Sequence, residues 1–309
     1  MRRRLDAELV RRGLADSRTQ ARTLIEAGRV RVGGAPATKA ARQVDAAEAV
    51  LVDGDGPRFV GRGGEKLDGA LEAFALDPSG LRVLDAGAST GGFTDALLQR
   101  GAREVVALDV GHGQLHERLR ADQRVVVMER TNLRHVDADA LGPFDAVVGD
   151  LSFISLTKVA EVLAGCVVPG GWLVLLVKPQ FEAGRREVSR GRGIISDPEE
   201  WSGAVERVVE AFAAHGVALE DLVVSPLRGA DGNVEFLVRL RSASAASAPV
   251  PADLRNRVDD ALERAGLAST RTAADHADDL PVPHGSDDPP VAGGADEADA
   301  PLVADEART

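Results

Sequence analysis

Apolar stretches rich in valine and leucine recur between residues 61 and 241, and segments with helical periodicity separate them. The strand candidates are Leu81–Asp85, Glu104–Asp109, Arg124–Glu129, Asp145–Gly149, Trp172–Lys178, Val217–Ser225 and Val234–Leu240. This alternation predicts an α/β domain with a mostly parallel sheet covered by helices on both faces. A short glycine-containing loop joins the last two candidates. It is too short for a parallel crossover, so the last of the seven strands is predicted to be antiparallel.

Residues 1–60 predict a separate small module of helices and a hairpin. Gly13 ends a first helix, residues 17–20 fit the capping box of a second, and Gly28 stands where a C-cap glycine belongs. Residues 30–36 alternate apolar and polar around a Gly-Gly pair, which predicts a hairpin.

The last segment, residues 242–309, contains seven of the fifteen prolines and no aromatic residue. Alanine and aspartate dominate it, a composition typical of a disordered acidic tail. Within it, the apolar residues Leu254, Val258 and Leu262 would share one face of a short helix over residues 252–266.

Charge is distributed unevenly along the chain, whose net charge is −12. Residues 1–42 carry 11 basic and 4 acidic side chains, whereas residues 242–309 carry 5 basic and 14 acidic ones. A basic front end with few acids nearby favours contacts with the phosphates of a nucleic acid. The arginines predicted to make these contacts are Arg3, Arg4, Arg11, Arg18 and Arg22.

Composition excludes several classes of protein. A single cysteine, Cys166, excludes a disulfide framework and a multi-cysteine zinc site, and no metal is predicted. The densest apolar run, Trp172–Val177, is far shorter than the ~20 residues of a membrane span. We therefore expect a cytoplasmic protein with no membrane partner; no pattern in the sequence specifies an oligomeric state.

A glycine-rich loop follows the first strand of the predicted sheet and begins a helix. Its spacing is D-x-G-x-x-x-G-G, and an acid at the strand end would repel a pyrophosphate but suits a ligand carrying an amino group and a sulfonium. Asp109 ends the second strand, where an acid typically binds ribose hydroxyls. The pattern resembles the S-adenosylmethionine site of class I methyltransferases, with a glycine-rich turn of another doubly wound fold as the alternative. The loop's candidate cofactor residues are Asp85, Gly87, Ser89, Gly91 and Gly92.

Four further polar residues, Lys66, Asp150, Lys178 and Glu235, are predicted at the same carboxyl edge of the sheet. This Lys-Asp-Lys-Glu set resembles that of the FtsJ-like ribose 2′-O-methyltransferases. A 2′-hydroxyl is a very weak acid, and a desolvated lysine can orient it and accept its proton, which arginine cannot do. We expect Asp150 and Glu235 to hold Lys178 electrostatically, and Lys66 to contact the substrate.

Two resemblances cover almost all of the chain outside the tail. Residues 3–58 resemble the αL RNA-binding fold of ribosomal small-subunit protein S-four and of pseudouridine synthases, most specifically in the pattern SRxxAxxLIxxGxVxV over residues 17–32. Residues 1–241 resemble the TlyA family of ribosomal RNA 2′-O-methyltransferases, many of which carry a haemolysin label. The segments that carry this resemblance are GRGGEKL, LDAGASTGGFTD, GDLSFISL, LLVKPQFE and SPLRGADGNVEFL. That resemblance implies cytidine ribose methylation in large-subunit and, in some members, small-subunit rRNA, on rRNA or ribosomal subunits. It also adds Phe93 and Asn132 as cofactor neighbours.

Three alternatives stay open. The arginine-rich segment that includes Arg185 and Arg186 could clamp RNA beside Lys178 or could be an ordinary surface loop. The whole chain could be a non-catalytic RNA-binding or ribosome-assembly factor, a reading that the intact Lys-Asp-Lys-Glu set argues against. A secreted haemolysin would need an export signal and a membrane-inserting segment, and neither pattern is found.

Overall fold

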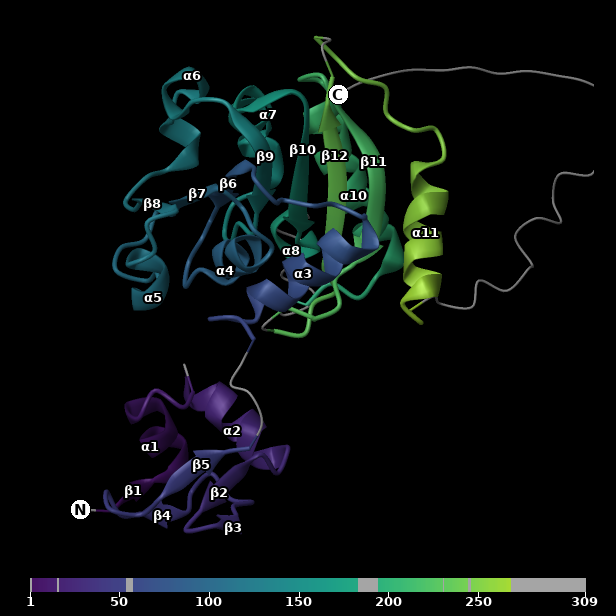
Figure 1. Ribbon diagram of the computed structural model, residues 1–309. Coiled ribbons are helices and arrows are strands. Elements are labelled where there is room, and N and C mark those ends of the chain that lie inside the picture. The colour runs from purple at the N-terminus through teal and green to yellow at the C-terminus, as the bar shows by residue number, and fades with distance from the viewer. Residues whose placement is uncertain are drawn as a thin grey trace, which may run out of the picture. The chain divides into compact units, whose positions relative to one another are not determined.

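The computed structural model describes residues 2–15, 17–53, 58–182, 194–229, 231–243 and 246–267 (Figure 1). Its helices and strands form an N-terminal domain over residues 3–52 and a larger domain over residues 63–264. Arg185 and Arg186 lie outside the described residues, so their predicted RNA contact remains a prediction.

The N-terminal domain packs two helices against short strands. Its elements are β1 (Arg3–Arg4), α1 (Leu5–Arg11), α2 (Arg18–Glu26), β2 (Val30–Val32), β3 (Ala35–Pro36), β4 (Gln43–Val44) and β5 (Val50–Val52). Ser17 Oγ accepts a hydrogen bond from the backbone N–H of Gln20 at 3.2 Å, which confirms the predicted cap of α2. Gly33 and Gly34 have φ of 60° and 84°, the left-handed backbone that a tight hairpin turn between β2 and β3 requires.

The larger domain alternates strands and helices. It consists of α3 (Gly63–Ala73), β6 (Arg82–Ala86), α4 (Gly92–Gln99), β7 (Glu104–Leu108), α5 (Glu117–Arg120), β8 (Val125–Met128), the 3₁₀ turn η1 (Leu133–His135), α6 (Ala138–Leu141), β9 (Phe144–Gly149), η2 (Leu156–Lys158), α7 (Ala160–Gly165), β10 (Val167–Val177), α8 (Pro179–Glu182), α10 (Pro198–Ala213), β11 (Val217–Val224), β12 (Phe236–Ser242) and α11 (Leu254–Arg264).

The seven strands of this domain form one sheet in the order β11-β12-β10-β9-β6-β7-β8. Strands β8, β7, β6, β9 and β10 pair in parallel, and β12 lies antiparallel between β10 and β11. The predicted architecture, including the antiparallel last strand, is therefore confirmed.

Helices cover both faces of the sheet (Figure 1). Successive strand residues point to opposite sides, so each face of the sheet presents its own apolar layer to these helices. In β6, Val83 joins the apolar layer under α3 and α4, whereas Leu84 joins the layer under α7 and α10. Both faces are thus buried, which explains the nearly continuous apolar character of the parallel strands.

Two predicted boundaries are wrong. Phe59 and Val60 are buried in the layer under α3, and the backbone N–H of Val60 donates to Asp95 Oδ2 at 2.8 Å, so the larger domain begins before residue 61. Residues from 242 onward are not all tail, because the short helix predicted there is confirmed as α11, which buries Leu254, Val258 and Leu262 in the main core. Its apolar stripe recurs every four residues, which is enough to hold a short helix against β11 and α10. Residues 268–309 lie outside the described residues.

Candidate active site

The loops after β6, β7, β8 and β9 line a pocket of about 560 Å³. It lies at the carboxyl edge of the sheet, where the chain turns from β6 to β7 on one side and later returns to β9 on the other. Such a topological switch point is where open α/β sheets bind ligands. Of the residues predicted to bind cofactor, Gly87, Ser89, Asp109 and Asn132 line this pocket.

Asp109 is held in place by backbone donors from two loops. Its Oδ2 accepts from the N–H of Ser89 at 2.8 Å, and its Oδ1 accepts from the N–H of Gly111 at 2.6 Å. An ionised carboxylate has about four acceptor positions, so two remain for the hydroxyl pair of a ribose. The geometry fits the role predicted for Asp109.

Asp85 lies fully buried at the end of β6, beneath the pocket. Thr94 Oγ1 donates to its Oδ2 at 2.6 Å, whereas Oδ1 has no hydrogen-bond partner among the described residues. Burial raises the pKa of Asp85 to about 7. An unpartnered buried carboxylate oxygen beside the pocket suits a cationic ligand, which would stabilise its ionised form.

The other predicted glycine-loop residues have different roles. Gly91 has φ of +98°, and a Cβ there would lie 2.2 Å from Leu119 Cδ1, so this glycine allows α4 to pack against α5. Gly92 and Phe93 line a second pocket, and Phe93 is also part of the core under α3. None of the four residues Asp85, Gly91, Gly92 and Phe93 lines the first pocket.

The four predicted catalytic residues meet as two ion pairs. Lys178 Nζ lies 2.5 Å from Asp150 Oδ1 and donates to Ser152 Oγ at 2.8 Å. Lys66 Nζ donates to Glu235 Oε2 at 2.5 Å. Both lysines are buried, which is costly unless each has a partner of opposite charge. The expectation that Glu235 holds Lys178 is wrong, because α3 brings Lys66 to Glu235 instead.

These two pairs line a pocket of about 260 Å³ next to the first one. The two pockets share four lining residues, Gly87, Ser89, Asp150 and Ser152. A ligand in the larger pocket and a second one in the smaller pocket would therefore meet at the Lys178–Asp150 pair. Two substrates are brought together in this way when a group passes from one to the other.

Sequence reasoning missed two residues at this junction. Ser152 binds Lys178 directly and could have been found from its place in Asp150-Leu151-Ser152. Phe153 lines the larger pocket with 92% of its surface exposed, and its φ of +66° is strained for a non-glycine residue. Strain and exposure of this kind at a site point to a functional role, and only the structure reveals them.

The predicted RNA-binding arginines surround two buried acids of α1. Arg4, Arg18 and Arg22 pair with Asp6, and Arg3 and Arg11 pair with Glu8. The sequence-based view that few acids lie nearby is therefore incomplete, since each carboxylate serves several guanidinium groups. The five arginines still expose between 41% and 55% of their side chains.

Within the described ranges, no group of three or more histidine, cysteine, aspartate or glutamate side chains is arranged to hold a metal ion. Across those ranges, every helix falls short of the length and apolar content needed to cross a bilayer.

A seven-stranded sheet of this order, with an acid-and-glycine loop at the switch point, defines a class I methyltransferase with S-adenosylmethionine as its cofactor. Comparison with known proteins narrows the class. Residues 59–242 match the FtsJ-like methyltransferases, and residues 3–51 match the S4 domain. The chain is 52% identical over 246 residues to the 16S/23S rRNA (cytidine-2′-O)-methyltransferase TlyA of Mycobacterium tuberculosis, which covers 78% of this chain and 90% of that protein. The chain belongs to the TlyA family of FtsJ-like methyltransferases.

Further relatives carry a different name. Hemolysin A of Brachyspira hyodysenteriae is 38% identical over 236 residues, covering 76% of this chain and 98% of that protein. A solved structure from Streptococcus thermophilus, also named as a hemolysin, is 36% identical. It covers 86% of this chain and 97% of its own chain, with a TM-score of 0.67.

Proposed function

We propose that this chain methylates the 2′-hydroxyl of a cytidine ribose in ribosomal RNA. The observation that carries the proposal is the Lys178–Asp150 pair, with Nζ and Oδ1 2.5 Å apart where the two pockets share their lining. The TlyA name of the M. tuberculosis relative supports the choice of cytidine and of rRNA. Asp85, Gly87, Ser89, Asp109 and Asn132 would form the cofactor side, with Gly91, Gly92 and Phe93 shaping the loop behind it.

Bound S-adenosylmethionine supplies an electrophilic methyl group. Lys178 would hydrogen-bond the 2′-hydroxyl through Nζ, orient the ribose oxygen toward that methyl group and take up the proton that the hydroxyl loses. The ammonium formed is stabilised by the Asp150 carboxylate and the Ser152 hydroxyl that already surround Nζ. Lys66, held by Glu235, keeps a positive charge in the smaller pocket, where it can bind a phosphate or hydroxyl of the target nucleotide.

Phe153 offers a surface for a base beside this site. Its exposed ring lies 5.4 Å from the Phe181 ring, and Lys178 Nζ lies 5.9 Å from the centroid of Phe181. A nucleotide whose ribose reaches Lys178 must leave its base stack, and stacking on an aromatic side chain offsets part of that cost. We assign Phe153 to this role.

RNA affinity comes mainly from the N-terminal domain. Its exposed arginines bind phosphates without reading the sequence, as expected for recognition of folded RNA by shape. Such shape recognition suits a ribosomal subunit or an assembly intermediate as the partner, and would place the activity in the cytoplasm, where these particles are made.

The test is methyl transfer from labelled S-adenosylmethionine to purified rRNA, to isolated subunits and to whole ribosomes. We expect transfer to at least one of these by the wild-type chain and almost none by Lys178→Ala. Equal transfer by both would contradict the proposal. No transfer by the wild-type chain to any of the three, although it binds S-adenosylhomocysteine and rRNA, would instead favour a non-catalytic assembly factor.

The hemolysin name of two relatives motivates a second assay. Purified protein is mixed with erythrocytes without S-adenosylmethionine. Under our proposal no lysis occurs. Lysis that survives Lys178→Ala would show a separate membrane activity.

A further inference from the structure

Three arginines from two elements of the N-terminal domain, β1 and α2, converge on a single oxygen atom. Asp6 Oδ2 accepts from Arg4 Nη2 and from Arg18 Nη2, each at 3.0 Å, and Arg22 Nε lies 3.6 Å away. Arg4 Nε also donates to Oδ1 at 3.1 Å. We call Arg4, Arg18 and Arg22 the Asp6 arginine cluster.

The Asp6 carboxylate is fully buried, whereas the three arginines around it keep 41–55% of their side chains exposed. Hydrogen bonds from Arg4, followed by those from Arg18, hold the pKa of Asp6 far below its usual range, so the group is ionised wherever the protein is folded. One negative charge thus stands behind three positive ones, and the cluster presents a net positive surface to solvent.

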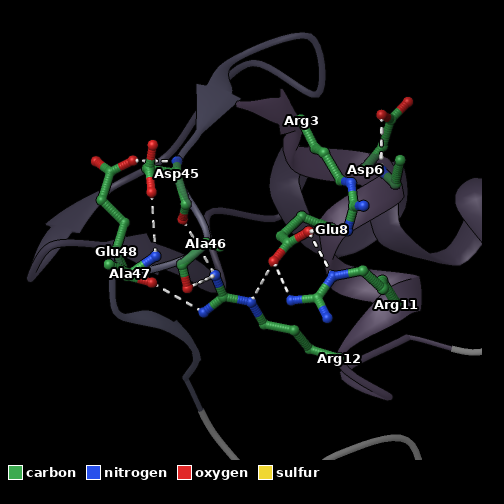
Figure 2. A network of polar contacts seen from close by, with 10 residues as sticks. Arg3, Asp6, Glu8, Arg11, Arg12, Asp45, Ala46, Ala47 and Glu48 are labelled. Carbon is green, nitrogen blue, oxygen red and sulfur yellow. Dashed lines mark hydrogen bonds and ion pairs between the residues drawn. The ribbon is translucent and has the colours of Figure 1, made fainter. Parts of the chain in front are cut away.

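The neighbouring acid of α1 makes a different arrangement, shown in Figure 2. Glu8 binds Arg11 through two hydrogen bonds of 2.8 and 2.5 Å and binds Arg12 Nε at 2.7 Å. Arg12 then donates to the backbone carbonyls of Asp45, Ala46 and Glu48 and is only 20% exposed. Those bonds join α1 to the loop after β4, so Arg12 is structural and cannot be offered to RNA.

Asp6 joins α1 to α2 through Arg18 and Arg22, but its arginines do not extend the connection to a third element as Arg12 does. Among the described residues, no further hydrogen-bond acceptor or acidic partner is found for Arg4, Arg18 or Arg22. Without the carboxylate, three guanidinium groups would repel one another and move independently. Holding them in advance lowers the entropy that binding must remove.

We propose that Asp6 is a positioning residue that gathers Arg4, Arg18 and Arg22 into one preformed site for backbone phosphates of RNA. This inference rests on the RNA-binding role proposed above and adds a consequence with an unexpected sign. Removing an acid from a basic surface should strengthen RNA binding if only net charge mattered. Removing Asp6 should weaken it.

The test compares Asp6→Asn with Asp53→Asn in the full chain. Asp53 is a 44% exposed acid that pairs with Arg31 in the same domain, so both changes add one unit of net charge. The measured quantity is the Kd for an in-vitro-transcribed large-subunit rRNA at several salt concentrations. We expect Asp6→Asn to weaken binding about tenfold. Its salt slope should fall by about 0.7–0.9 per lost phosphate contact. Asp53→Asn should not weaken binding, and S-adenosylhomocysteine affinity should be unchanged in both.

The variant Asp6→Glu distinguishes an electrostatic role of Asp6 from a packing role, because it keeps the negative charge but has a larger side chain. Under our proposal Asp6→Glu binds RNA better than Asp6→Asn, because the carboxylate still gathers arginines. If Asp6 only fills space, the isosteric Asp6→Asn is the better tolerated change, and that order would overturn the proposal.

Arginine variants distinguish failure of this inference from failure of the proposed function. If Arg4→Ala and Arg18→Ala bind rRNA like the wild type, the N-terminal domain is not the RNA anchor and both fail. If these two weaken binding while Asp6→Asn binds as well as or better than the wild type, only the positioning role of Asp6 is contradicted.

Discussion

The catalytic edge of the sheet and the N-terminal domain both pair basic side chains with buried acids, but the basic residue type differs between them. At the catalytic edge the bases are Lys66 and Lys178, both buried, each with one carboxylate. Around Asp6 of α1 they are arginines of β1 and α2, with partly exposed side chains gathered around the buried carboxylate. Lysine can release and accept a proton and arginine cannot, so the first arrangement suits chemistry and the second suits permanent charge.

The use of lysine at the catalytic edge is informative because the chain contains only four lysines and 33 arginines. Two of the four lysines occupy the catalytic pairs. Burial shields these two lysines from salt and solvent, whereas the arginines around Asp6 stay accessible to both. The comparison therefore predicts that chemistry and RNA binding can be damaged separately.

The largest effect is expected from Lys178. Lys178→Ala should lower kcat about 10²–10⁴-fold, because positioned proton transfer is lost. Lys178→Arg should fail almost as badly, since a guanidinium does not accept the proton. As the matched control, Lys158→Arg makes the same change at an exposed lysine of η2 and should leave rRNA methylation nearly unchanged. Turnover of Lys178→Arg near the wild-type rate would remove the distinction between the two regions.

Deleting residues 1–53 should reduce rRNA methylation at physiological salt by about 10²-fold or more, because several phosphate contacts are lost together. Residues 58–60 are kept because they pack in the larger domain. Calorimetry should show unchanged S-adenosylhomocysteine affinity. A deletion variant that methylates rRNA at the full rate would show that RNA is anchored elsewhere.

Asp109→Ala should weaken S-adenosylhomocysteine binding by about 1–3 kcal/mol, since lost hydrogen bonds leave polar groups unpaired. The backbone donors of Ser89 and Gly111 would also lose their acceptor. The Kd for rRNA should not change. Unaltered cofactor affinity would mean that the ribose-binding acid lies elsewhere.

The smallest predicted effect is a pH dependence through Asp85. Burial raises the pKa of Asp85 to about 7, so the ionised carboxylate destabilises the folded protein above that pH. Acidification protonates the carboxylate and removes this destabilisation. A cationic cofactor needs the ionised form. Lowering the pH from about 8 to about 6 should therefore weaken S-adenosylmethionine binding by up to about tenfold. Asp85→Asn should abolish this dependence, and a variant that titrates like the wild type would assign the effect to another group.

Most of the larger domain could be predicted from sequence because each strand ends at a recognisable residue. The main discrepancy is β10, which begins at Val167 instead of Trp172, because the sheet register shifts across Gly170 and Gly171. Apolar counting does not detect a strand that continues through glycines.

The sequence predicts that Lys66, Asp150, Lys178 and Glu235 lie together at one edge of the sheet, but not which of them pair. Residues at strand ends were placed correctly by topology, whereas the partner of Glu235 depends on where α3 carries Lys66. The same limit applies to α1. Net charge identified a basic surface, but the burial of Asp6 and its convergence with Arg18 depend on helix packing.

The central claim, ribose methylation of cytidine, is tested most directly by identifying the product nucleoside. The rRNA is incubated with the full chain and labelled S-adenosylmethionine, digested completely to nucleosides and separated by mass-resolved chromatography. The account predicts label in 2′-O-methylcytidine, and none when Lys178→Ala replaces the wild type. Label in a base-methylated nucleoside would contradict it, because Lys178 and Asp150 would then be serving a different acceptor.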